Sequence, residues 1–145
     1  MKNTEVLNDL IEINNDRVAG YEKAAKESKD SDLCTLFQDL ANESKKLASE
    51  LRSRVEPGEE SPTGGTVRGS IYRTWMDVKA KFGGDDRKSL LASCEFGEDA
   101  AQDAYKRALN TEGISPEVRT VIENQKTVLR QSHDKIKRMR DGAPA

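Results

Sequence analysis

Two glutamates, Glu95 and Glu98, are the residues whose type and placement suggest chemistry in this sequence. They lie in a predicted helix over residues 90–109, where Glu98 interrupts an apolar stripe. The residues of that stripe recur every three or four positions and therefore share one face of the helix, which we expect to face the core: Leu91, Cys94, Glu98, Ala101, Tyr105 and Ala108. A buried carboxylate is costly unless it is paired, protonated or bound to a metal. We therefore expect Glu95 and Glu98 to turn inward at a central polar site.

The other long predicted helices also carry polar residues halfway along their apolar stripes. These residues are amides and hydroxyls, namely Asn14, Asn15, Ser44, Gln125 and Ser132. Together they predict a hydrogen-bonded layer that fixes the register of the helices. Tyr21 and Tyr105 fall on inner stripes, and we expect their hydroxyls to join this layer or reach solvent. A redox-active phenol beside a metal is the alternative.

A dimetal centre is one alternative to a structural layer. Such a centre takes one Glu from each of two helices and a Glu-x-x-His pair from each of the other two. At the expected level, one pair is Glu43-x-x-Lys46 and the other is Arg130-x-x-His133, so each contains a cation in place of a ligand. Asn15 stands where a Glu is expected. The two cations would oppose a divalent metal, and we expect them to neutralise nearby glutamates instead.

A single-metal or altered site is the other form of the metal hypothesis. Its candidate ligands are Glu95, Glu98, His133, Glu43 and Asp16. Carboxylates with one imidazole suit iron or manganese, which are the cofactors this hypothesis implies. His133 is the only histidine of the chain, and a lone histidine beside an apolar stripe is more often structural than a ligand.

Four long amphipathic helices and one short helix must position these residues. Apolar periodicity predicts them over residues 4–28, 32–55, 70–82, 90–109 and 116–140. Residues able to cap their starts are Thr4, Asp30 or Ser31, Asp85 or Asp86, and Ser115 before Pro116. Pro and Gly predict a linker over residues 56–69, and the tail 141–145 should fray. Gly20, inside a helix, would allow a neighbouring helix to approach closely.

The long connection over residues 56–84 decides the topology. The short turns near residues 29–31 and 110–115 each join antiparallel neighbours. A long connection can return to the starting end, which makes the second and third long helices parallel. We therefore predict an all-α, ferritin-like four-helix bundle, with a short extra helix in the long crossover, as a single domain over residues 1–145. An up-down-up-down bundle is the alternative.

Composition narrows the class of function. The chain has 145 residues, 34% charged, with a net charge of −2, so we expect no nucleic-acid partner. The basic run 135–140 complements the dipole of its helix. The sequence contains no apolar run of the roughly 20 residues that a membrane span needs, and no signal-peptide core, so we expect a cytoplasmic protein without a membrane partner. Cys34 and Cys94 are expected as small core residues, with a redox pair as the alternative.

Three stretches carry a family resemblance. They are VLNDLIEINNDRVAGYEKA at 6–24, GSIYRTWMDVKAKF at 69–82 and CEFGEDAAQDAY at 94–105. The chain resembles, over about residues 5–140, a bacterial family of ferritin-like four-helix-bundle proteins of unknown function. The resemblance implies a ferritin-like fold and ancestry among metal-binding bundles, and it implies no established activity.

Two functional hypotheses follow. The first is a non-enzymatic structural or interaction protein with a degenerate central polar site, and analogy to ferritin-like relatives suggests a stress-related role. Its partner would be a second copy of the chain, bound through helix faces or through the segment of Tyr72, Trp75 and Phe82. The second hypothesis is an iron- or manganese-binding bundle, either an oxidase or a storage protein.

Overall fold

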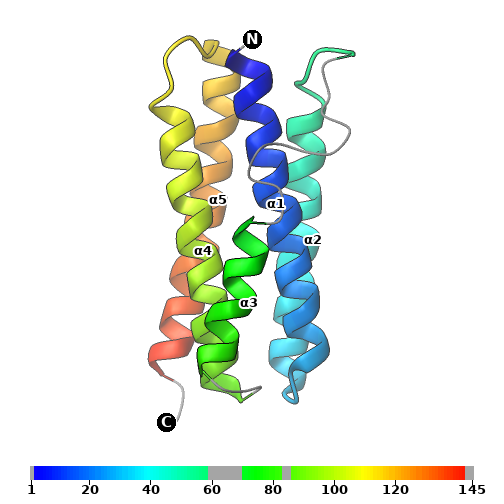
Figure 1. The fold of residues 1–145 in the computed structure, drawn as a ribbon, viewed down its shortest axis with the longest axis vertical. Coiled ribbons are helices and arrows are strands. Elements are labelled where there is room, and N and C mark those ends of the chain that lie inside the picture. Colours follow the sequence, from blue (N-terminus) through cyan, green and yellow to red (C-terminus); the bar gives the residue numbers. More distant parts are fainter. Residues whose placement is uncertain (1, 59–69, 83–85, 143–145) are drawn as a thin grey trace.

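Four long helices pack side by side in the computed structural model, which describes residues 2–58, 70–82 and 86–142 (Figure 1). They are α1 (Lys2–Glu27), α2 (Ser31–Arg52), α4 (Arg87–Leu109) and α5 (Pro116–Asp141). The short helix α3 (Ser70–Phe82) lies between α2 and α4 in the sequence. The predicted all-α bundle with an extra helix in the long connection is therefore confirmed. Within the described residues, no helix is both long and apolar enough to cross a membrane.

Two helix starts have the predicted side-chain caps. The Asp86 carboxylate accepts a hydrogen bond from the backbone N–H of Ser89 at 2.8 Å. The Ser115 hydroxyl accepts one from the backbone N–H of Val118 at 3.3 Å, with Pro116 in the first turn of α5. These bonds satisfy N–H groups that the first turn of a helix leaves without an internal partner.

The other predicted boundaries differ in detail. Asp30 is the N-cap residue of α2, but its side chain makes no capping bond. Helix α1 already includes Lys2, so the prediction of Thr4 as N-cap is wrong. Residues 59–69 of the predicted linker and 143–145 of the predicted tail lie outside the described residues.

Two long-range contacts establish the topology. Arg87 at the start of α4 pairs with Asp30 at 3.1 Å and with Asp32 at 2.8 Å, so α4 starts beside the turn between α1 and α2. At the other end, Asn3 of α1 accepts a hydrogen bond from the backbone N–H of Ser115 at 3.0 Å. Helices α2 and α4 therefore run parallel, as do α1 and α5 (Figure 1). The bundle therefore has a single long crossover between α2 and α4, and the up-down-up-down alternative is wrong.

The core consists of two apolar clusters with polar residues between them. The first cluster includes Leu7, Leu51, Tyr105 and Leu129, and the second includes Tyr21, Phe37, Leu91 and Ile136. Each long helix contributes to both clusters and carries buried polar side chains between its two contributions. Burial of a large apolar side chain stabilises the fold by about 1.5–3 kcal/mol, so the two clusters supply the main driving force for packing.

Helix α3 packs against α1 and α4 and lies between them in Figure 1. Its Trp75 is 1% exposed and packs against Gly20 and Gly97. A Cβ atom added at Gly20 would lie 2.6 Å from the Trp75 ring, and one at Gly97 would lie 2.3 Å away. The predicted close approach at Gly20 is confirmed, and the approaching element is α3. Trp75 is thus a core residue, while Tyr72 is half-buried and the side chain of Phe82 is not among those described.

Candidate functional site

An ion pair between Arg17 of α1 and Glu98 of α4 lies at the centre of the bundle. The Arg17 side chain is 2% exposed and that of Glu98 is 0% exposed. Arg17 Nη2 donates to Glu98 Oε2 at 2.7 Å and Nε donates to the same oxygen at 3.2 Å. The Tyr21 hydroxyl donates to this oxygen as well. None of the described groups donates to the other carboxylate oxygen, Oε1.

The opposite edge of the guanidinium contacts α2. Arg17 Nη1 donates to Ser44 Oγ at 2.6 Å and pairs with Glu43 Oε1 at 3.0 Å. That glutamate oxygen also accepts a hydrogen bond from Ser132 Oγ of α5 at 3.0 Å. Arg17 therefore links α1, α2 and α4 directly, and it links α5 through Glu43.

A chain of hydrogen bonds continues from Ser44 toward the first apolar cluster. Ser44 Oγ donates to Asn14 Oδ1 at 3.0 Å, and Asn14 Nδ2 donates to the Tyr105 hydroxyl at 2.8 Å. The Tyr105 hydroxyl donates to Gln125 Oε1 at 2.6 Å, and Gln125 Nε2 donates to Glu50 at 2.7 Å. Each bond joins a donor on one helix to an acceptor on another, so the chain of bonds favours one relative register of the four long helices.

The electrostatics of the layer keep Arg17 charged and keep Tyr21 and Cys94 protonated. Burial alone lowers the pKa of Arg17, but the charge and hydrogen bond of Glu98 outweigh it and hold the pKa above its usual value. Burial, with the charge of Glu98, raises the pKa of Tyr21 well above its usual value. The same two causes raise the pKa of Cys94, and a thiol that stays protonated is a poor nucleophile. The layer thus contains a permanent cation beside a neutral phenol and a neutral thiol.

Four of the five predicted polar-layer residues meet in this network: Asn14, Ser44, Gln125 and Ser132. Asn15 does not. It lies on the exposed side of α1, where its Oδ1 accepts a hydrogen bond from Arg52 at 3.3 Å. Successive residues of an α-helix point about 100° apart, and at Asn15 this rotation turns the side chain away from the core that Asn14 enters.

Arg17 is the residue that the sequence analysis missed. Val18, the next residue on α1, is only partly buried, whereas Arg17 is buried. The spacing from Asn14 to Arg17 to Tyr21 fits a helical stripe, and an arginine on such a stripe was the available signal. Lys46 and Arg130, which were expected to neutralise the glutamates, are both exposed, and Arg17 has that role instead.

The predicted metal ligands divide into separate places. Glu98 and Glu43 face Arg17, while Glu95 and His133 lie at the α4–α5 edge. Asp16 is buried on α1 and belongs to neither group. A dimetal centre needs carboxylates and imidazoles that converge on two cations. The donor set of the central layer does not fit one, because a guanidinium lies between its two glutamates and the chain's histidine is elsewhere.

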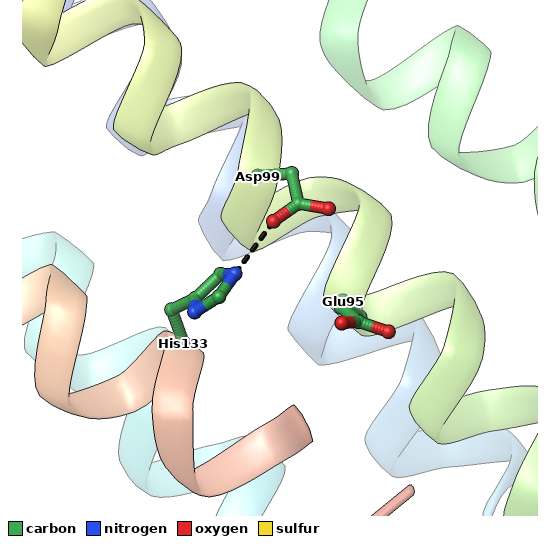
Figure 2. Close-up of side chains that lie close together, drawn as sticks. All are labelled: Glu95, Asp99 and His133. Carbon is green, nitrogen blue, oxygen red and sulfur yellow. Dashed lines mark hydrogen bonds and ion pairs between the residues drawn. The ribbon is translucent and has the colours of Figure 1, made fainter. Parts of the chain in front are cut away.

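The α4–α5 edge brings Glu95, Asp99 and His133 together (Figure 2). Asp99 Oδ1 lies 2.6 Å from His133 Nε2, and Asp134 Oδ1 lies 3.0 Å from His133 Nδ1. Glu95 lies one turn before Asp99 on α4 and pairs with Arg140 of α5. Asp99 was not among the predicted ligands, although its position four residues after Glu95 places both on one helix face.

A family model described as "Domain of unknown function (DUF2383)" matches residues 2–111 of the chain. The match begins with α1 and extends just beyond the end of α4, so it includes Arg17, Glu43 and Glu98. No curated protein matches the chain.

Proposed function

This chain belongs to the family of the domain of unknown function DUF2383, and we propose on that premise that it is a non-enzymatic, ferritin-like bundle with a structural or interaction role. One observation carries the proposal: the Arg17 guanidinium lies between Glu98 and Glu43 in the central layer. In dimetal bundles, carboxylates of facing helices converge on divalent cations at this level. Here a side-chain cation balances those carboxylates, and the central site is degenerate.

The energetics of the layer support a structural role. Replacing a buried ion pair by apolar residues is often neutral or stabilising, so such pairs are poor sources of stability. A buried polar network instead disfavours packings in which its donors and acceptors do not meet. The pairing of Arg17 with Glu98, continued through Ser44 to Gln125, therefore supports a function as a rigid and uniquely packed body.

An oxidase assay tests the non-enzymatic assignment. Purified protein is mixed with Fe²⁺ and oxygen, and the formation of Fe³⁺ is followed by absorbance. We expect the same rate for the wild type, for Glu98→Gln and for buffer alone, because Glu98 is already paired with Arg17. Oxidation that is faster than in buffer and is lost in Glu98→Gln would refute the assignment.

The interaction role is tested by self-association. We propose a second copy as partner, bound through the outer helix faces, because the Trp75 side chain of the predicted aromatic segment is used within the bundle. Sedimentation velocity over a concentration series should show a concentration-dependent dimer or larger assembly. A monomer at every concentration would exclude self-association and leave a different protein as the partner.

A further inference from the structure

We propose that Glu95, Asp99 and His133 form a mononuclear site for a divalent transition-metal ion at the α4–α5 edge, outside the central layer. One ligand atom from each residue lies within 4.8 Å of the other two (Figure 2). Ligand atoms about 2.1 Å from one ion can lie up to about 4.2 Å apart. The three side chains would therefore need only small movements to share one ion.

The two helices hold these ligands on a rigid frame. Glu95 and Asp99 are four residues apart on α4 and share a face, and His133 approaches from α5. Helices α4 and α5 form an antiparallel hairpin, which fixes the backbone positions that hold the two carboxylates and the imidazole. Ligands on rigid elements lose little entropy when a metal binds.

Asp134 gives His133 the orientation of a metal ligand. Its Oδ1 lies 3.0 Å from His133 Nδ1, so Nδ1–H can donate to the carboxylate and leave the Nε2 lone pair for a metal. Metal-bound histidines commonly donate their second N–H to a carboxylate or carbonyl in this way. His133 Nε2 contacts Asp99 Oδ1 directly at 2.6 Å, so a bound ion would replace this contact and would coordinate both atoms.

Burial and charge also suit a cation. The side chains of Glu95 and His133 are 13% and 14% exposed, while that of Asp99 is 59% exposed. The site thus has a sheltered wall and an open side where water can complete the coordination. Two carboxylates balance a divalent ion. The competing cation is Arg140, which can leave Glu95 and keep its 2.7 Å ion pair with Asp141.

The donor set narrows the class of ion. One imidazole nitrogen with two carboxylate oxygens suits Zn²⁺, Fe²⁺, Mn²⁺ or Co²⁺. Magnesium and calcium prefer all-oxygen sites, and Cu⁺ prefers sulfur ligands. Zinc is the appropriate first probe because it has no redox chemistry, and cobalt reports its ligand geometry by visible absorption.

The test is a Zn²⁺ titration of the full chain in competition with a chromogenic chelator. The titration uses protein without a polyhistidine tag, so that His133 is the only histidine in the sample. We expect one ion per chain in the wild type, with an affinity more than about 100-fold weaker in His133→Gln and Asp99→Asn. Asp134→Asn should weaken binding by about 10–100-fold, the usual effect of losing an outer-shell partner. The Co²⁺ spectrum should change in the same variants.

Asp103→Asn is the matched control, because Asp103 is exposed on α4 four residues after Asp99 and is not part of the cluster. It should bind Zn²⁺ as the wild type does, and circular dichroism should show that all metal-free variants are folded. Equal binding by wild type and His133→Gln, or no binding, would overturn the site and leave the proposed function standing. Binding that depends on Glu98 instead would overturn both.

Discussion

Arg17 and Glu98 are each other's principal charged partners in a part of the bundle that solvent does not reach. Their energetics are therefore asymmetric. Losing one member leaves an uncompensated buried charge, whereas losing both removes the desolvation cost together with the attraction. Glu43 offers Arg17 a second carboxylate, but its side chain is 28% exposed, so it cannot shield the guanidinium as Glu98 does.

Replacing one member of the pair is the residue-scale prediction. Arg17→Met should lower the free energy of unfolding by about 3–5 kcal/mol, because it leaves Glu98 buried without a cation. Urea denaturation followed by circular dichroism measures the change. The double variant Arg17→Met/Glu98→Leu is the control, and it should regain most of the loss. If the free energy of unfolding of Arg17→Met were within about 1 kcal/mol of the wild-type value, the result would contradict an ion pair of Arg17 and Glu98 that is shielded from solvent.

At the scale of the elements, Trp75 is the buried contact of α3 with the bundle, and the ion pair of Lys79 with Glu27 at 3.0 Å adds a second attachment. Trp75 enters the space left by Gly20 and Gly97, and its ring is edge-on to Tyr21, with ring centroids 5.2 Å apart. Two helices that lack a Cβ at facing positions can admit a ring that any larger residue would exclude. The packing of Trp75 therefore requires that Gly20 and Gly97 have no side chain.

Filling this space should displace α3. Gly97→Ala places a Cβ 2.3 Å from the Trp75 ring, and we expect a loss of about 1–3 kcal/mol from overpacking. Trp75 is the only tryptophan, so its fluorescence should shift to longer wavelength as the ring moves toward water. Gly142→Ala is the control, since its added Cβ comes no closer than 3.4 Å to a neighbouring atom. In a protein that already carries Trp75→Leu, Gly97→Ala should lower the free energy of unfolding much less than it does in the wild type. An equal loss in the two backgrounds would argue against this contact.

The Asp86 cap at the start of α4 should give part of the stability a pH dependence. The hydrogen bond from the Ser89 N–H lowers the pKa of Asp86 below its usual value. A lowered folded-state pKa contributes stability above the unfolded value, about 3.9, and this contribution disappears as the pH falls through the folded-state pKa. Asp86→Ala should therefore have a lower urea midpoint than wild type at pH 7, and the difference should shrink below about pH 4.

The control for the cap is Asp103→Ala, which removes an exposed carboxylate from the middle of α4. It should leave the urea midpoint at pH 7 nearly unchanged. If the difference between Asp86→Ala and wild type were the same at pH 7 and at low pH, the carboxylate form of Asp86 would not be the cap.

For the whole molecule, the central layer joins the two apolar clusters. Each long helix contributes residues to both clusters, so unfolding of the helices in one cluster would disrupt the other cluster as well. Trp75 fluorescence reports the second cluster, and far-ultraviolet circular dichroism reports all helices. We expect the two signals to share one urea midpoint, as a two-state transition requires. Separate midpoints would show that the clusters unfold independently.

Local pattern by itself determined the helices, two of their caps and the polar interruption of their stripes. Apolar spacing, capping residues and glycine or proline breaks act over a few neighbouring residues, so they can be read without a partner. The inward position of Glu98 and the hydroxyls of Tyr21 and Tyr105 followed from that spacing.

Only the tertiary structure decided which polar groups meet. Whether Arg17 or Val18 faces inward depends on the rotation of α1 about its axis, and neighbouring helix residues differ by about 100°. The meeting of Asp99 with His133 depends on the register of α4 against α5. Rotation and register are settled when all four long helices pack at once, because each long-range contact constrains the others. The spacing of residues within one helix contains no information on how the four helices are rotated and aligned against one another.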